Sequence, residues 1–422
     1  MVGRERRWLV LSPYRVLDLT TERGLLCGQI LGDLGADVIK IEPPGGSPAR
    51  RLGPFYRDQP HPDRSLYWWA YNRNKRSITL NLDTSEGQAI LRRLVGGAHF
   101  FIESDNPGAL AKRGLGYADL AATSPALVYV SISPFGQDGP KASYADSDLI
   151  ILAASGPLVI TGDDDRPPVR VSVPQGYLHA SGQAAVAALI AHHERQRSGQ
   201  GQHVDVSAQQ AAAQATQSNI LATPLGEHEF GRMSGGVKMG PLKIRLIWPA
   251  KDGHVAIAYL FGSAIGPFTR RLMQWICEAS FCDEATRDKD WIAFGSLFFG
   301  DPQAIAEYER LKQIVEDFTA SKTKAELLQG ALERVLLIAP ITTIEEVVQS
   351  EQLATRGYWR ALEHPELDQT FRYPGQFAKF STTPIIYRRR PPTVGEHNRE
   401  IYGGELGFTE RQLAELQSKG VI

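Results

Sequence analysis

Strand-like and helical segments alternate through the first third of the chain, and this alternation constrains the fold more than any other feature. Apolar strand-like runs occupy residues 15–19, 37–41, 77–82, 100–103 and 127–132. A helical pattern over residues 25–34 lies between the first two of these runs. Strands separated by helices at this repeat predict a parallel sheet with helices on both faces. We therefore expect an α/β fold with a Rossmann-like, parallel-sheet large domain. Residues 20–25 (TTERGL) lack the Gly-x-Gly-x-x-Gly pattern after the first strand, so a bound nicotinamide dinucleotide is not predicted.

Capping signals place two of the helices. Residues 84–86 (TSE) start a helix for which Thr84 or Ser85 is available as a cap. A second, alanine-rich helix covers residues 181–193 and ends before Gly199. Its larger apolar residues share one face, and these are Val186, Leu189 and Ile190.

The length of 422 residues predicts two domains, because single cores stop growing at about 250–300 residues. Composition changes near Pro224, after which a glycine-rich loop and several tryptophans appear. We expect a large domain over residues 1–222 and a smaller α+β domain with the glycine-rich loop over residues 223–340. Residues 341–422 then form a separate C-terminal segment.

Charge and composition exclude several classes of function. The chain has 46 basic and 47 acidic residues, so no overall field attracts nucleic acid or a membrane surface. The longest apolar runs, such as residues 149–154, are far below the ~20 residues of a membrane span. Residues 1–7 are mixed in sign and do not form a signal peptide, which favours the cytoplasm. Cys27, Cys277 and Cys282 have neither disulfide-framework nor metal-ligand spacing, so no metal site is predicted.

Four segments occur in one order and at one spacing, namely residues 15–20 (RVLDLT), 35–46 (GADVIKIEPPGG), 72–78 (NRNKRSI) and 198–202 (SGQGQ). Together with the closing residues 395–398 (GEHN), they resemble the class III CoA-transferase family, which also contains the α-methylacyl-CoA racemases. The resemblance runs from about Tyr14 to the C-terminus. It implies CoA or acyl-CoA as a substrate and no tightly bound cofactor. It also implies a C-terminal segment that returns to the large domain and two chains interlocked as rings.

The family's nucleophile is an aspartate, and the corresponding residue here is Tyr177. In the family, this carboxylate attacks an acyl-CoA thioester to give a mixed anhydride and CoA thiolate, and exchange through an enzyme-bound thioester then transfers CoA to the acceptor acid. Counting forward from Pro167 and backward from Gly199 without gaps ends both times on Tyr177. A phenol with an ordinary pKa of ~10 is mostly protonated at neutral pH, and an aryl ester cannot replace the anhydride. We therefore predict that the chain has no catalytic residue of its own.

Other acid or base groups near this position are less suited to the chemistry. Residues 163–165 (DDD) could supply a carboxylate, but they are typical of a turn with solvated charges. The histidine used by the racemase branch corresponds to Ser147, so both racemase acid/base groups are missing. His179 lies near Tyr177 but is more typical of a cap region or an interface than of a general base.

Much of the CoA pocket is matched at the level of sequence. Lys75 and Arg76 correspond to a basic segment of the family and are predicted to neutralise phosphates, with a solvated basic surface as the alternative. The glycine-rich loop corresponds to a lid. The predicted CoA-binding residues are Arg23, Lys75, Arg76, Ala109 and Lys112, and the predicted lid residues are Gly235 and Gly236.

A retained fold without the nucleophile predicts a non-nucleophilic subunit of a heteromeric class III CoA-transferase. Its homologous partner carries the catalytic aspartate, and the reaction moves CoA between a donor such as succinyl-CoA and a carboxylic acid. The first loop and residues 177–180 (YLHA) resemble subunits of heteromeric family members of anaerobic aromatic degradation, such as the succinyl-CoA:benzylsuccinate type. Two alternatives stay open: an inactive acyl-CoA-binding or regulatory homodimer, and a homodimeric CoA-transferase that uses an unrecognised carboxylate.

Overall fold

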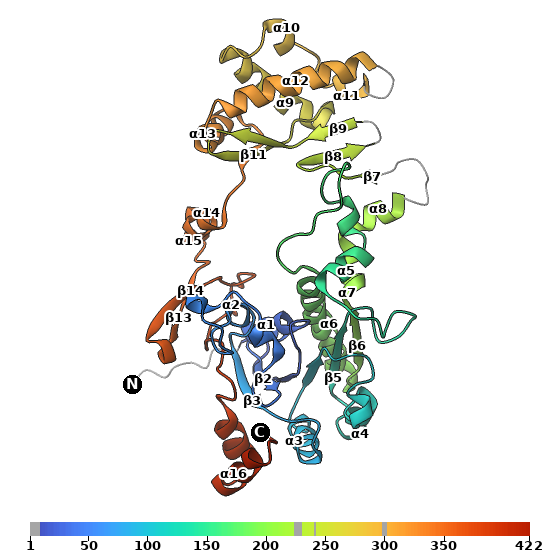
Figure 1. Cartoon of the computed structure of the whole chain (residues 1–422), viewed down its shortest axis with the longest axis vertical. Coiled ribbons are helices and arrows are strands. Elements are labelled where there is room, and N and C mark those ends of the chain that lie inside the picture. Colours follow the sequence, from blue (N-terminus) through green and yellow to red (C-terminus); the bar gives the residue numbers. More distant parts are fainter. Residues whose placement is uncertain (1–8, 223–229, 240–241, 298–301) are drawn as a thin grey trace. The chain divides into compact units, whose positions relative to one another are not determined.

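A computed structural model describes residues 9–222, 230–239, 242–297 and 302–422. The chain divides into two compact units (Figure 1). The first unit contains Met1–Gly156, Val171–Ala215 and Glu351–Ile422, and the second contains Pro157–Arg170 and Thr216–Ser350.

The borders of these units differ from the domain borders expected from sequence. Pro157–Arg170 belongs to the second unit, although it lies within the predicted large domain. Residues 341–350 also belong to the second unit, and the C-terminal part of the first unit starts at Glu351. The second unit resumes at residue 216 rather than after residue 222, so residues 216–222 also lie outside the first unit. The N-terminal residues 1–7 lie outside the described part of the chain.

The first unit is built on a parallel sheet with the strand order β3-β2-β1-β4-β5-β6. Its strands are β1 (Arg15–Asp18), β2 (Asp37–Glu42), β3 (Lys75–Thr79), β4 (Phe100–Glu103), β5 (Val128–Ser133) and β6 (His203–Ser207). The predicted Rossmann-like sheet is confirmed. The chain reverses its direction across the sheet between β1 and β4, and ligands of such sheets bind at the carboxyl ends of the strands beside this switch point.

Helices connect and cover these strands. They are α1 (Leu25–Asp33), α2 (Leu66–Tyr71), α3 (Ser85–Val95), α4 (Tyr117–Thr123), α5 (Asp148–Ala154), α6 (Gly176–Ser198) and α7 (Ala208–Ala213). Helix α3 starts as its capping signal predicts, since Thr84 Oγ1 accepts a hydrogen bond from Gly87 N at 3.0 Å. Ile90 and Leu91 of this helix are buried in the core of the unit.

Helix α6 buries a different face from the one that its larger apolar residues suggested. Ala184 and Ala188 are fully buried, whereas Val186 and Ile190 are 58% and 64% exposed. Alanine leaves room for a close approach of the helix to its neighbours in the unit, and Gly199 ends the helix with φ +73°. Val186 and Ile190 are therefore exposed apolar side chains of α6 in this chain.

The C-terminal part of the first unit completes its core. Its elements are α15 (Glu351–Thr355), β13 (Arg360–His364), β14 (Gln369–Tyr373), a π-helix (Arg399–Glu405) and α16 (Glu410–Ser418). Ile401 and Tyr402 are fully buried in the same core as β2 and β3. Asn81 N donates to Val421 O at 2.8 Å, so the chain end is fixed beside the residues that follow β3.

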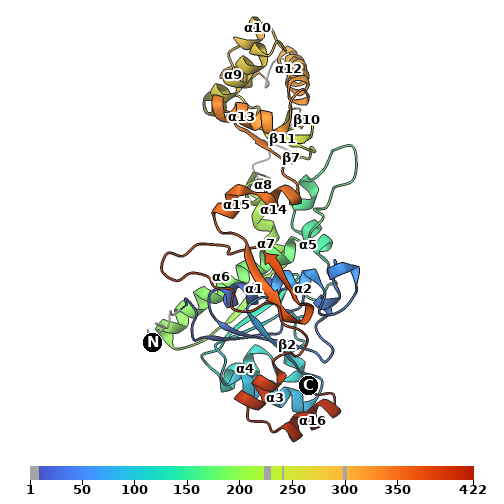
Figure 2. The same ribbon diagram turned by 90° about the vertical axis from the view of Figure 1, so that its left-hand side faces the viewer.

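The second unit has its own core, centred on Trp248, Tyr259, Trp291 and Tyr308. Figure 2 shows its helices α9, α12 and α13 near strands β10 and β11. Its elements are α8 (Gln217–Ala222), β7 (Phe230–Gly231), β8 (Gly236–Met239), β9 (Leu242–Arg245), β10 (Ile247–Ala250), β11 (Gly253–Ile257), α9 (Gly262–Glu278), α10 (Glu284–Arg287), α11 (Phe294–Leu297), α12 (Pro302–Ala320), α13 (Lys324–Arg334), β12 (Ile338–Pro340) and α14 (Ile344–Gln349). None of the helices in the described part of the chain combines the length and the apolar composition needed to cross a membrane.

Candidate functional site

The loops that follow β1 and β4 meet at the switch point of the sheet. Thr21 N donates to Ser104 Oγ at 2.8 Å. The guanidinium of Arg23 donates from Nη1 to Ser104 O at 3.2 Å and to Asn106 Oδ1 at 3.0 Å. These bonds hold Arg23 at the carboxyl edge of the sheet, where the topology places the candidate site.

Tyr177 lies at the start of α6 and contacts this arginine through an intervening carboxylate. The Tyr177 hydroxyl donates to Asp146 Oδ2, and Asp146 Oδ1 lies 2.6 Å from Arg23 Nη2. Burial, together with the hydrogen bond to Asp146 and the negative charge of Asp146, raises the pKa of Tyr177 above its ordinary value of 10. The phenol therefore stays protonated and acts as a hydrogen-bond donor in this site.

The start of α6 is fixed by the start of α5. Asp148 Oδ1 accepts hydrogen bonds from Gln175 N at 2.7 Å and from Gly176 N at 2.8 Å. A Cβ atom on Gly176 would lie 2.7 Å from Ile151 Cγ2, so only glycine fits between the two helices. Both contacts hold the next residue, Tyr177, in place.

Two other residues considered from the sequence are Ser147, which corresponds to the racemase histidine, and His179, which lies two residues after Tyr177. Ser147 caps α5, since its Oγ accepts from Ile150 N at 3.3 Å. His179 lies in the first turn of α6 and is exposed.

Sequence reasoning missed Asp146, which bridges Arg23 and Tyr177. These three residues are separated by 123 and 31 positions along the chain, and no periodicity connects them. The only sequence feature that pointed to Asp146 was its place directly before Ser147, which corresponds to the racemase histidine.

Lys75 does not point toward a ligand, which corrects the prediction that it neutralises a phosphate. Its side chain is fully buried, and Nζ donates to Asp18 Oδ2 at 2.9 Å, Leu25 O at 2.8 Å and Asn72 Oδ1 at 2.9 Å. An ammonium has three donors, and all three are used inside the protein. The solvated basic surface, which was the alternative, is also wrong for Lys75.

Arg76 is likewise committed to internal ion pairs. Its guanidinium lies 2.6 Å from Asp37 Oδ2, 2.8 Å from Glu400 Oε1 and 2.5 Å from Glu405 Oε1. Two of these carboxylates belong to the C-terminal segment, so Arg76 connects that segment to the sheet. This geometry does not support the predicted phosphate contact.

The loop after β4 presents the remaining predicted CoA-binding residues. Ala109 N donates to Asn106 O at 2.9 Å, which closes a turn beside Gly108 with φ +78°. Lys112 is exposed on the following short 3-10 helix, and within the described residues its ammonium has no hydrogen bond or ion pair. Ala109 and Lys112 keep their predicted role in CoA binding as a proposal.

The acidic residues 163–165 form a turn, as predicted, but all three carboxylates are ion-paired. Asp163 and Asp165 pair with Arg166, and Asp164 pairs with Lys238 and Lys243. Asp163 Oδ1 accepts from Ser234 N at 2.9 Å. Hydrogen bonds from Lys238 and Lys243 lower the pKa of Asp164 to about 2. These contacts belong to the second unit and hold its β7-β8-β9 sheet.

The predicted lid residues also lie in the second unit. Gly235 O accepts from Leu246 N and Ile247 N, both at 2.8 Å. A Cβ atom on Gly236 would lie 2.2 Å from Ile244 O, so this position excludes larger residues. The two glycines form a close turn in a sheet, and their lid function stays a prediction.

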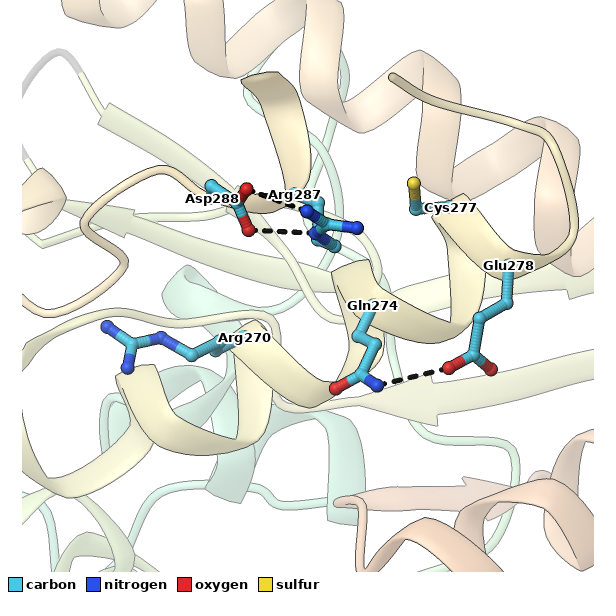
Figure 3. A pocket seen from close by; sticks show the side chains of 6 residues that line it. All are labelled: Arg270, Gln274, Cys277, Glu278, Arg287 and Asp288. Carbon is cyan, nitrogen blue, oxygen red and sulfur yellow. Dashed lines mark hydrogen bonds and ion pairs between the residues drawn. The ribbon is translucent and has the colours of Figure 1, made fainter. Parts of the chain in front are cut away.

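Figure 3 shows a pocket of about 800 Å³ on α9 and α10 of the second unit. Arg287 Nη2 lies 2.8 Å from Asp288 Oδ2, and Gln274 Nε2 donates to Glu278 Oε1 at 3.1 Å. Ligand pockets for acyl groups are mainly apolar, so this polar lining does not fit one. Across the described ranges, no group of three or more His, Cys, Asp or Glu residues is arranged to hold a metal ion.

Comparisons with known proteins agree on one family. The model of CoA-transferase family III matches residues 11–398. The chain is 31% identical to the succinyl-CoA:(R)-benzylsuccinate CoA-transferase subunit BbsE of Thauera aromatica, over 97% of this chain and 98% of that protein. It is 34% identical to the succinyl-CoA–D-citramalate CoA-transferase of Chloroflexus aurantiacus, over 98% of each chain. A crystal structure of a CAIB/BAIF family protein from Brucella suis matches with a TM-score of 0.79 and 26% identity, over 93% of this chain and 98% of the other. The chain belongs to CoA-transferase family III.

Proposed function

We propose that this chain is the non-nucleophilic subunit of a heteromeric CoA-transferase, and that a homologous partner chain carries the catalytic aspartate. Family membership supports CoA-transferase activity with CoA thioesters as substrates. The observation that carries the finer proposal is the hydrogen bond from the Tyr177 hydroxyl to Asp146. It keeps a protonated phenol at the position where the family has its nucleophile.

The chemistry of transfer explains why this substitution matters. The attacking group must form an acyl derivative as activated as the thioester, so that CoA thiolate can add again after the acids exchange. A carboxylate forms such an anhydride, whereas a neutral phenol is a poor nucleophile and gives a less activated ester. A partner with aspartate at the position of Tyr177 supplies the missing step.

Asp146 is one candidate for the unrecognised carboxylate of the homodimeric alternative, because it contacts Tyr177. Its Oδ1 is ion-paired to Arg23, and its Oδ2 accepts the hydrogen bond of Tyr177. Both carboxylate oxygens are therefore already engaged by charged or hydrogen-bonding partners, which lowers their reactivity toward a thioester. The geometry therefore favours the heteromeric proposal over nucleophilic attack by Asp146.

Two further observations support a partner chain. One relative, BbsE, is itself named as a subunit of a CoA-transferase. Val186 and Ile190 expose β-branched side chains on α6, and exposed apolar faces of this kind are typical of protein contacts. We propose that the two homologous chains interlock, with the α6 face among the covered surfaces.

Transfer assays with separate and mixed chains test this proposal. CoA transfer from succinyl-CoA to a panel of carboxylic acids is measured with this chain alone, with the homologous chain encoded beside it, and with both. Activity only in the mixture, lost when the partner's aspartate is changed to alanine, is the expected result. Full activity of this chain alone would contradict the proposal.

A further inference from the structure

We infer that Arg23 and Tyr177 form a binding subsite for the carboxylate of a substrate, and that Asp146 occupies this subsite in the isolated chain. The inference rests on the proposed function, because it names the class of acid that the transferase takes. The expected class is a dicarboxylic acid, or its mono-CoA thioester, whose distal carboxylate replaces that of Asp146.

The two donors match the two oxygens of a carboxylate. Arg23 Nη2 donates to Asp146 Oδ1 at 2.6 Å, and the Tyr177 hydroxyl donates to Asp146 Oδ2. A guanidinium and a protonated phenol are both pure donors toward such a group, and one of them is charged. The carboxylate of a substrate placed at the same point would satisfy both donors equally well.

The donors are held firmly, whereas Asp146 is the last residue of a loop with few backbone hydrogen bonds, directly before Ser147, which caps α5. Arg23 is also bound to Ser104 O and Asn106 Oδ1, and Tyr177 is part of α6. In the described structure, the backbone hydrogen bonds donated by residues 138–146 are internal to this loop, from Ala142 N to Gly139 O and from Tyr144 N to Lys141 O. Tyr144 is 57% exposed, although its ring contacts Phe135. The acceptor can therefore leave while the donors stay in place.

The surrounding charges limit the subsite to one carboxylate. Asp148 already accepts two backbone amide hydrogens at the start of α6, and Glu22 contributes a further negative charge beside Tyr177. A second carboxylate in the subsite would be repelled by Glu22, and no second guanidinium would be there to neutralise it. The other carboxyl group of the acid must therefore lie outside the subsite, as it does in a dicarboxylic acyl thioester.

Binding of succinate to the single chain tests the inference without any transfer step. The variant Asp146→Asn keeps the size of the side chain but removes the competing charge, and we expect it to bind succinate at least about tenfold more tightly than the wild type. The double variant Arg23→Gln/Asp146→Asn should lose this gain in affinity for succinate. Uncharged succinamide should show no gain in affinity with any of the variants.

Asp83→Asn is the matched control, because it also removes a carboxylate from an arginine. Asp83 Oδ1 lies 2.7 Å from Arg113 Nη2 on the surface of the same unit. This variant should bind succinate as weakly as the wild type. A folded Asp146→Asn variant that binds no more tightly than Asp83→Asn would overturn the inference.

Hydrogen exchange on the wild-type chain covers the case in which Asp146→Asn does not fold. Saturating succinate should increase exchange at the hydrogen-bonded amides of Ala142 and Tyr144, relative to sodium chloride at equal ionic strength. Unchanged exchange there would overturn the inference. Neither experiment involves the partner chain. If the mixed chains transfer CoA but both succinate experiments are negative, the subsite is rejected and the proposed function stands.

Discussion

The ammonium nitrogen of Lys75 lies 2.9 Å from Asp18 Oδ2, and both side chains are fully buried at the carboxyl end of β1. Lys40 Nζ lies 3.2 Å from the other oxygen of Asp18. Burial alone would raise the pKa of Asp18, but the charges of Lys40 and Lys75 hold it at about 2, below the ordinary 3.8. Asp18 also accepts from Thr20 N at 2.9 Å, so this group of charges supports the loop that carries Arg23.

Removal of the Lys75 charge should destabilise the chain. Lys75→Met leaves buried Asp18 with one cation instead of two, and breaking buried pairs costs about 3 kcal/mol of unfolding free energy. Denaturant unfolding measures this loss. The control Lys379→Met changes an exposed lysine and should alter the free energy by less than about 0.5 kcal/mol. Equal stabilities of the two variants would contradict the structural role of Lys75.

CoA affinity should depend on Lys112. Lys112→Ala removes an exposed ammonium without an internal partner, and we expect CoA to bind about three- to tenfold more weakly, because a single exposed charge contact is worth about 1 kcal/mol. Titration calorimetry with CoA measures the change, with Lys379→Ala as the control. If Lys112→Ala binds CoA as tightly as this control does, Lys112 has no phosphate contact.

Loss of the Tyr177 hydroxyl should leave kcat largely intact, although it removes one of the two donors of the inferred carboxylate subsite. In the mixed enzyme, Tyr177→Phe should keep kcat within about tenfold of the wild type, because the hydroxyl forms no covalent bond with the acyl group. Its stability should fall by about 1–2 kcal/mol, since a buried hydrogen bond to a carboxylate is lost. A drop in kcat comparable to that caused by the partner's Asp→Ala variant would contradict this account.

Glu103 should make stability depend on pH. Burial raises the pKa of this carboxyl group from 4.5 to about 7. Between these two values the folded chain binds more protons than the unfolded chain, so the free energy of unfolding falls as pH rises from about 4.5 to 7. Glu103→Gln removes this loss, because the neutral side chain does not titrate. The difference in free energy of unfolding between the variant and the wild type should therefore be about 2 kcal/mol more favourable to the variant at pH 8 than at pH 5. An equal effect at both pH values would contradict the raised pKa.

The alternation of strands and helices was sufficient to predict the sheet and several of its elements. Residues 100–103 coincide with β4, and Thr84 caps α3 as its sequence indicates. Local propensity determines these features, so they can be found without tertiary contacts. The buried face of α6 could not be predicted in this way, because periodicity shows which side chains share a face but not which face the neighbouring elements cover.

The candidate site was only partly predictable. Sequence comparison located Tyr177, whereas its partner Asp146 depends on a long-range contact that only the fold provides. Lys75 was assigned to a CoA phosphate because it matches a basic segment of the family, with a solvated surface as the alternative. A signal against this was present, since Asp18 and Lys40 interrupt the apolar runs of β1 and β2, and charged residues in central strands are rarely buried unless they are paired.

The most direct test of the central claim is identification of the residue that carries the acyl group. The mixed chains are incubated with succinyl-CoA, treated with hydroxylamine and analysed by mass spectrometry of their peptides. We predict a hydroxamate on the partner's aspartate and none on this chain. A hydroxamate on Asp146, or on any carboxylate of this chain, would contradict its assignment as the non-nucleophilic subunit.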